Sequence, residues 1–298
     1  MSDAPARITD FKVLVFDVYG TLADWETGIY EELKPMLSRY RQSAGWSRKE
    51  VLEAFTAVEA DLQAKFPSLL YSDLLAKAHE VMEQTLRASA GEALEGAGLD
   101  SSGASTSDQS APVPLGEAHI RFGQSIKNWS IFPDSSAALH ALSKHYKLVV
   151  LSNVDRQSFS HTLAKLSEGG STAFAPESYS PPESEEYWFP QRNPGSKSPF
   201  TLVLTAQDVQ SYKPALHGFK VALDVIHKDA ALLNTPKDRV LWVAQSLSHD
   251  IEPANRLGVT GVYINRRGAY MGFPSGAEPH YAWKFETLGE MAEAVEKA

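Results

Sequence analysis

Short apolar runs recur along the chain, separated by longer stretches with a helical period. The runs are Val13–Phe16, Leu148–Leu151, Leu202–Leu204, Val240–Val243 and Val259–Ile264. Runs that are apolar at nearly every position are typical of strands buried on both faces, as in parallel sheets. Their alternation with helical stretches predicts an α/β fold with a doubly wound parallel sheet. Ligands bind such sheets at the carboxyl ends of the strands.

The stretch between the first two apolar runs is too long for a single crossover connection. Within it, Trp25 to Arg87 carries apolar residues at the 3.6-residue period of amphipathic helices, such as Ile29, Leu33 and Leu37. We therefore expect an inserted helical cap domain over residues 23–125. Residues 1–22 and 126–298 would form the α/β core, and the cap would lie over the carboxyl end of the sheet.

Two segments depart from this alternation. Ser89–Gly116 is poor in large apolar residues, which predicts a flexible loop in the cap domain. Ser167–Pro199 is rich in proline and aromatic residues. Because it leads from a helix into a strand, we expect it at the edge of the sheet opposite the catalytic end, with a structural or interface role rather than a substrate role.

Composition narrows the classes of partner. The 298-residue chain has 43% hydrophobic residues, a formal net charge of −9 and no cysteine. The acidic balance argues against nucleic acid and anionic membrane surfaces, which need basic patches, and no stretch is as long and apolar as a membrane span. The lack of cysteine excludes disulfides and thiolate chemistry. We expect a cytoplasmic protein.

The stretch from Lys12 to Trp25, KVLVFDVYGTLADW, places an acid directly after the first buried strand. A carboxylate at a strand end faces the crevice of the sheet and can act as a nucleophile. Gly20 and Thr21 follow Asp17, and a threonine there can bond the turn or the carboxylate. A lone Asp17 could equally cap the following helix.

Four motifs resemble those of the haloacid dehalogenase superfamily, in the same order. They are FDVYGTL at 16–22, LSNVDR at 151–156, SYKPALHGF at 211–219 and WVAQSLSHDIEPANRLGV at 242–259. Each begins at or follows a predicted strand. The resemblance implies the superfamily's Rossmann-like core and an aspartate nucleophile, and it favours catalysis over helix capping for Asp17.

Two positions favour the dehalogenase branch over the magnesium-dependent phosphatases. The phosphatases carry a second acid two residues after the nucleophile, where this chain has Tyr19, and a further acid where it has Gln245. A leaving alkoxide needs a proton donor, whereas halide leaves without one. A divalent cation prefers carboxylate oxygens to a neutral amide. The resemblance thus implies a type II 2-haloacid dehalogenase-like hydrolase that needs no metal or cofactor.

The resemblance assigns the remaining roles. Asp17 would attack the halogen-bearing carbon and form an ester, Lys213 would hold Asp17 ionised, and Asp250 would orient or activate the water that hydrolyses the ester. Ser152 and Asn153 would bind the carboxylate of a small anionic substrate near a helix N-terminus. A homodimer is compatible with the family.

The substrate contacts match the family less well. Tyr19 and Gln245 are expected to line the substrate site, but Gln245-Ser246-Leu247 replaces the family's Ser-x-Asn. Arg48 lies near the expected position of the halide-binding arginine, although in a different local sequence. Two alternatives stay open: a phosphatase or other hydrolase with an altered metal site, and a non-catalytic protein that uses the fold for binding.

Overall fold

The computed structural model describes residues 6–91, 116–169, 174–184, 187–274, 276 and 279–298. Its centre is a six-stranded sheet in which all paired strands are parallel, in the order β3-β2-β1-β4-β5-β6. The strands are β1 (Val13–Phe16), β2 (Lys147–Ser152), β3 (Phe200–Thr205), β4 (Val240–Ala244), β5 (Thr260–Ile264) and β6 (Trp283–Phe285). All five predicted strands are confirmed; β6 was not predicted.

The sheet is covered on both faces, as its uniformly buried strands predict. Leu14 and Phe16 share one apolar cluster with α5 (Ser135–Leu142), α6 (Arg156–Glu168) and α10 (Leu288–Lys297). Val13 and Val15 point to the other face, toward α8 (Leu216–Lys228) and α9 (Glu252–Arg256). The short helix α7 (Ala206–Val209) follows β3 directly. The predicted doubly wound architecture is therefore confirmed.

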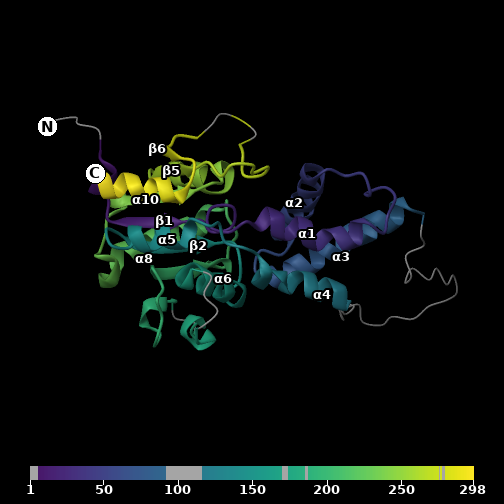
Figure 1. The fold of residues 1–298 in the computed structure, drawn as a ribbon, viewed down its shortest axis with the longest axis horizontal. Helices are drawn as coiled ribbons and strands as arrows, with labels where there is room; N and C mark the ends of the chain where they lie inside the picture. The colour runs from purple at the N-terminus through teal and green to yellow at the C-terminus, as the bar shows by residue number, and fades with distance from the viewer. Residues whose placement is uncertain (1–5, 92–115, 170–173, 185–186, 275, 277–278) are drawn as a thin grey trace, which may run out of the picture.

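Four helices between β1 and β2 form a separate body beside the sheet (Figure 1). They are α1 (Trp25–Leu37), α2 (Arg48–Lys65), α3 (Tyr71–Ser89) and α4 (Glu117–Gly123). Gly123 permits the contact between α4 and α3, since a Cβ there would lie 2.2 Å from the Ser72 carbonyl oxygen. This inserted helical domain contains the predicted helices, while residues 92–115 of the predicted flexible loop lie outside the described residues.

The proline- and aromatic-rich segment covers the free edge of β3. Trp188 and Tyr179 are buried, and the Val203 backbone N–H donates to the Trp188 carbonyl at 2.8 Å. The segment also reaches the start of α6, where Arg156 donates to the Ser184 carbonyl at 2.7 Å. Because α6 begins at the carboxyl end of β2, the expectation that this segment stays opposite the catalytic end is wrong. Its buried aromatics give it a structural role.

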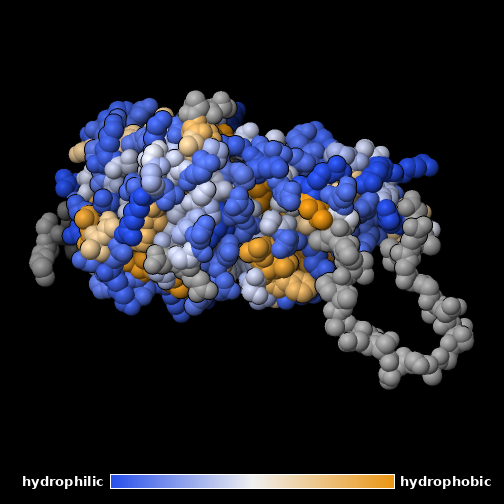
Figure 2. Space-filling model, turned by 90° about the horizontal axis from the view of Figure 1, so that it is seen from below, coloured by the Kyte–Doolittle hydropathy of each residue, from blue (hydrophilic) through white to orange (hydrophobic). Residues whose placement is uncertain are grey.

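The visible surface is mostly hydrophilic. On the face drawn in Figure 2, hydrophilic residues dominate and apolar side chains gather in a few small areas. In the part of the chain that the structure describes, every helix is too short or too polar to cross a membrane.

Candidate active site

Asp17 lies at the carboxyl end of β1, in the middle of the sheet, and both of its carboxylate oxygens accept hydrogen bonds. Lys213 Nζ donates to Oδ1 at 2.7 Å, and Thr21 Oγ1 donates to Oδ2 at 2.6 Å. Gly20, at φ +100°, makes the turn that brings Thr21 back to the carboxylate. Thr21 Oγ1 also accepts from the Gln245 backbone N–H at 2.8 Å, so the same hydroxyl ties the first motif to the fourth.

Lys213 is buried between two carboxylates. Its Nζ donates to Asp17 at 2.7 Å, to Asp250 Oδ1 at 2.9 Å and to the Leu151 carbonyl at 3.0 Å, which uses all three ammonium protons. Burial alone would lower the pKa of Lys213, but the two carboxylates outweigh it and hold that pKa above its ordinary value. The ammonium is therefore a fixed positive charge at the centre of the site.

Asp250 lies on the π-helical turn Leu247–Ile251, which follows β4. Besides Lys213, Trp242 Nε1 donates to its Oδ1 at 3.1 Å, whereas Oδ2 is buried with no partner among the described residues. Burial raises the pKa of Asp250 to about 7; the Lys213 ammonium opposes this rise and the Asp17 charge adds to it. Asp250 thus changes its charge near neutral pH.

The carboxyl end of β2 supplies Ser152 and Asn153. Ser152 lines the cavity, and its hydroxyl is buried without a hydrogen-bond partner in the described part of the chain. The Asn153 amide, in contrast, donates to the Lys213 carbonyl at 3.1 Å and accepts from the Lys213 backbone N–H at 2.7 Å. Both ends of this amide hold the backbone of Lys213, and the expected contact of Asn153 with a substrate carboxylate stays a prediction.

Tyr19 and Gln245 both line the cavity, as predicted, but their polar groups are engaged elsewhere. The Tyr19 hydroxyl lies 2.8 Å from Thr162 Oγ1, and burial raises the pKa of this phenol above its ordinary value. Gln245 Nε2 donates to the Met271 carbonyl at 2.9 Å. Tyr19 is therefore poorly suited to donate a proton to a leaving group.

Arg48 lies outside the cavity that holds Asp17. Its Nη2 donates to Thr27 Oγ1 at 2.9 Å and lies 3.9 Å from Asp24 and 4.0 Å from Glu26, within a second cavity of about 300 Å³. Arg48 therefore does not line the cavity that holds Asp17, where the resemblance placed it. As the first residue of α2, it points toward α1 instead of toward the sheet.

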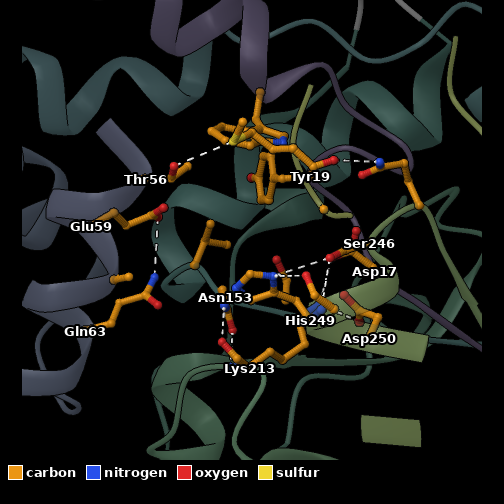
Figure 3. A pocket seen from close by; sticks show the side chains of 18 of the residues that line it. Asp17, Tyr19, Thr56, Glu59, Gln63, Asn153, Lys213, Ser246, His249 and Asp250 are labelled. Atoms are coloured by element: carbon orange, nitrogen blue, oxygen red, sulfur yellow. Dashed lines mark hydrogen bonds and ion pairs between the residues drawn. The ribbon is translucent and has the colours of Figure 1, made fainter. Parts of the chain in front are cut away.

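The cavity at the carboxyl end of the sheet has a volume of about 320 Å³ and lies between the sheet and the helical domain (Figure 3). Asp17, Lys213 and Asp250 form its sheet side. Its other wall comes from the helical domain, from Thr56, Glu59 and Gln63 on α2 and Tyr71 on α3. A small molecule in this cavity would touch the carboxylate of Asp17 at one end and α2 at the other.

The cavity residues fit a divalent cation poorly. Gln245 stands where the resemblance would require a metal-binding acid, and its amide is turned toward Met271. The Lys213 ammonium lies between the Asp17 and Asp250 carboxylates. In the described ranges, no group of three or more His, Asp or Glu side chains could hold a metal ion. Magnesium prefers near-octahedral oxygen ligands, which this set does not supply.

Neither a protein-family model nor a curated protein matches the sequence. Solved structures do match its fold. The L-2-haloacid dehalogenase PA0810 superposes with a TM-score of 0.59 at 18% identity, covering 97% of this chain and 100% of that one. The L-2-haloacid dehalogenase from Xanthobacter autotrophicus gives 0.57 at 16% identity, covering 96% and 98%. The chain has the haloacid dehalogenase fold.

This fold also occurs in a magnesium-bound protein. The HAD hydrolase YfnB from Bacillus subtilis, solved with bound magnesium, superposes with a TM-score of 0.58 at 12% identity, covering 96% of this chain and 99% of that one. A shared haloacid dehalogenase fold therefore does not select the reaction, which has to be argued from the residues in the cavity.

Sequence reasoning did not identify two contributors to the site. Trp242 appears in the sequence as one more apolar residue of a buried strand, yet its indole N–H donates to Asp250. Glu59 follows the pattern of a polar face on an amphipathic helix, yet it lines the cavity. An aromatic residue with a polar atom in a buried strand is a usable signal; for Glu59 the sequence offers none.

Proposed function

We propose that the protein is a hydrolase that forms a covalent ester on Asp17, as a metal-independent 2-haloacid dehalogenase does. The observation that carries this proposal is the cluster of Asp17, Lys213 and Asp250, with Tyr19 and Gln245 at the two places where a magnesium-dependent phosphatase needs acids. The cluster supplies a nucleophile and a base but no acid for an alkoxide leaving group.

In the first step, an Asp17 oxygen attacks the carbon that bears the halogen. A carbon–oxygen bond forms, the carbon–halogen bond breaks and the halide leaves with the electron pair. The Lys213 ammonium and the Thr21 hydroxyl orient the carboxylate for this attack. The Ser152 hydroxyl, which has no partner among the described residues, would bond the substrate carboxylate.

In the second step, water attacks the carbonyl carbon of the ester. Asp250 in its ionised form accepts one proton from that water as its oxygen bonds to the Asp17 carbonyl carbon. The bond from this carbon to the ester oxygen then breaks, and the second proton of the water passes to the departing alkoxide. This gives the hydroxy acid and the restored Asp17 carboxylate, and Asp250 releases its proton to solvent. The buried position of Asp250 and its pKa of about 7 suit a general base near neutral pH. Overall, one water and one haloacid give one hydroxy acid, one halide and one proton.

The test is chloride release from S-2-chloropropionate in the presence of EDTA, followed by mass spectrometry of Asp17 after a single turnover in ¹⁸O water. We expect chloride release and ¹⁸O in the Asp17 carboxylate, with both lost in Asp17→Asn. A folded protein that releases no chloride, or that hydrolyses p-nitrophenyl phosphate only with Mg²⁺, would overturn the proposal.

A further inference from the structure

The wall of the cavity opposite Asp17 carries an acid that the proposed reaction does not use. Glu59, on α2, lines the cavity (Figure 3). Tyr71 lines it as well. The Tyr71 hydroxyl donates to Glu59 Oε1 at 2.6 Å, and Gln63 Nε2 lies 3.4 Å from the same oxygen. Among the described residues, Glu59 Oε2 has no hydrogen-bond partner. One oxygen is therefore fixed by the protein and the other is left for a ligand.

The charges around the cavity favour a substrate that carries a positive group in addition to its carboxylate. Its described lining holds three carboxylates, on Asp17, Asp250 and Glu59, but Lys213 is its one lysine or arginine. That ammonium is already shared between Asp17 and Asp250. Burial lowers the pKa of His249, which keeps this imidazole neutral at pH 7. Nothing in this lining compensates a negative charge on Glu59.

The size of the cavity also indicates that a substrate can reach the α2 side, where Glu59 lies. A volume of about 320 Å³ falls at the lower end of the range of pockets that hold drug-sized ligands, about 300–1,000 Å³. A molecule the size of 2-chloropropionate held at Asp17 would leave the α2 side of the cavity unfilled. A longer substrate would extend toward Glu59 and past the rings of Trp25 and Tyr71, which also line the cavity.

We propose that Glu59 is a specificity-determining residue, and that the substrate carries a protonated amine at the end distant from the carbon that Asp17 attacks. The free Oε2 would accept a hydrogen bond from this ammonium, and the aromatic rings beside it favour a cation. Burial raises the pKa of Glu59 to about 7, and a bound cation would favour its ionised form. This inference deepens the proposed function and rests on it for the reaction at Asp17.

The test compares two substrates of equal size. In 2-chloro-4-aminobutyrate an ammonium replaces the terminal methyl of 2-chloropentanoate. We expect the protein to prefer the amine in kcat/KM, and Glu59→Met to reduce that preference at least about tenfold, as for a lost hydrogen bond between charged groups. Met keeps the length and helix propensity of Glu. Glu53→Met, on the exposed face of α2, is the matched control and should keep the preference.

A binding measurement separates this inference from the proposed reaction. Calorimetry compares 4-aminobutyrate with pentanoate, neither of which can react, in the unmodified protein and in Glu59→Met. Tighter binding of the amine that depends on Glu59 supports the inference even if no chloride is released from either substrate. The inference would be overturned if the unmodified protein and Glu59→Met preferred the amine over its apolar analogue to the same degree, in both turnover and binding. The proposed function would then be unaffected.

Discussion

The two walls of the cavity differ in how their polar groups are satisfied. On the sheet side, Lys213 donates all three ammonium protons, to Asp17, to Asp250 and to a backbone carbonyl. Thr21 donates to the second oxygen of Asp17. On the side of the helical domain, Glu59 keeps one oxygen without a partner among the described residues. A hydrogen-bond network in which every group has a partner holds its side chains in one geometry, whereas an acceptor without a partner can bind a ligand. If the proposed function holds, the sheet side would carry the reacting groups, and the helical domain would select the substrates that reach them.

Opening the closed network at its centre should have the largest effect. Lys213→Met leaves two buried carboxylates facing each other with no cation between them. We expect chloride release to fall about 100- to 1,000-fold and the free energy of unfolding to fall by about 3–5 kcal/mol. Kinetics and urea unfolding measure the two quantities.

The control for this change is Lys220→Met, which removes an exposed lysine of α8. It should leave both activity and stability close to those of the unmodified protein. If Lys213→Met unfolds at the same urea concentration as this control and keeps its rate, the network on the sheet side does not hold the site together.

The next largest expected effect is the pH dependence of turnover, which tests Asp250 on the sheet side of the cavity. Because the pKa of Asp250 is raised to about 7, its carboxylate is protonated below that pH and cannot accept a proton from water. In the ester, Asp17 has lost the charge that adds to this rise in pKa, so we expect the hydrolysis rate of the ester to rise with pH with a midpoint no higher than about 7. Single-turnover kinetics from pH 5 to 9 measure this step.

Asp250→Asn is the companion variant for the pH profile. It should hydrolyse the ester slowly, and the rate should not rise near pH 7. The ester should then accumulate on Asp17, where mass spectrometry detects the added mass. A rise near pH 7 that survives in this variant would assign the titration to another group.

The smallest expected effect concerns the helical domain away from the cavity. His79 on α3 and His119 on α4 face each other with their Nδ1 atoms 2.7 Å apart. Burial and the neighbouring His119 lower the pKa of His79 from 6.5 to about 4. The unfolded chain therefore binds a proton more readily than the folded one between these two pH values. We expect the free energy of unfolding to fall by about 1–2 kcal/mol from pH 6.5 to 4.5.

Urea unfolding at several pH values tests this, with His79→Gln as the comparison. The variant should lose less stability over the same pH interval, and its ratio of amine to apolar substrate turnover should match that of the unmodified protein. An equal loss in both proteins would place the acid sensitivity elsewhere in the chain.

The sequence predicted the sheet well because its signal is local. Buried strands of a parallel sheet are apolar on both faces, and five such runs were found where the strands are. The missed strand β6 is three residues long and only partly buried, so it lacks that pattern. Asp17, Lys213 and Asp250 each lie in a motif, which made their convergence predictable.

Side-chain partners could not be predicted in the same way, because they depend on tertiary neighbours. Arg48 has the expected spacing from Asp17, but its position at the start of α2 directs it to Thr27. Asn153 has the expected position after β2, yet Lys213 offers it two backbone groups. From the sequence alone, an acid on an amphipathic helix, such as Glu59, is assigned to the face that contacts solvent. Only the packing of that helix over the sheet shows that Glu59 lines the cavity.

The start of α3 is attached to the sheet domain by two strong contacts. Tyr212 donates its hydroxyl proton to the Leu69 carbonyl at 2.6 Å, and the Asp155 carboxylate accepts from the Ser72 backbone N–H at 3.0 Å. On the α2 side the contact is softer, a threonine hydroxyl 3.6 Å from the sulfur of Met271. Because the backbone at the start of α3 is held in this way, Tyr71 and the wall of the cavity that it forms stay at a set distance from the carboxyl end of β2.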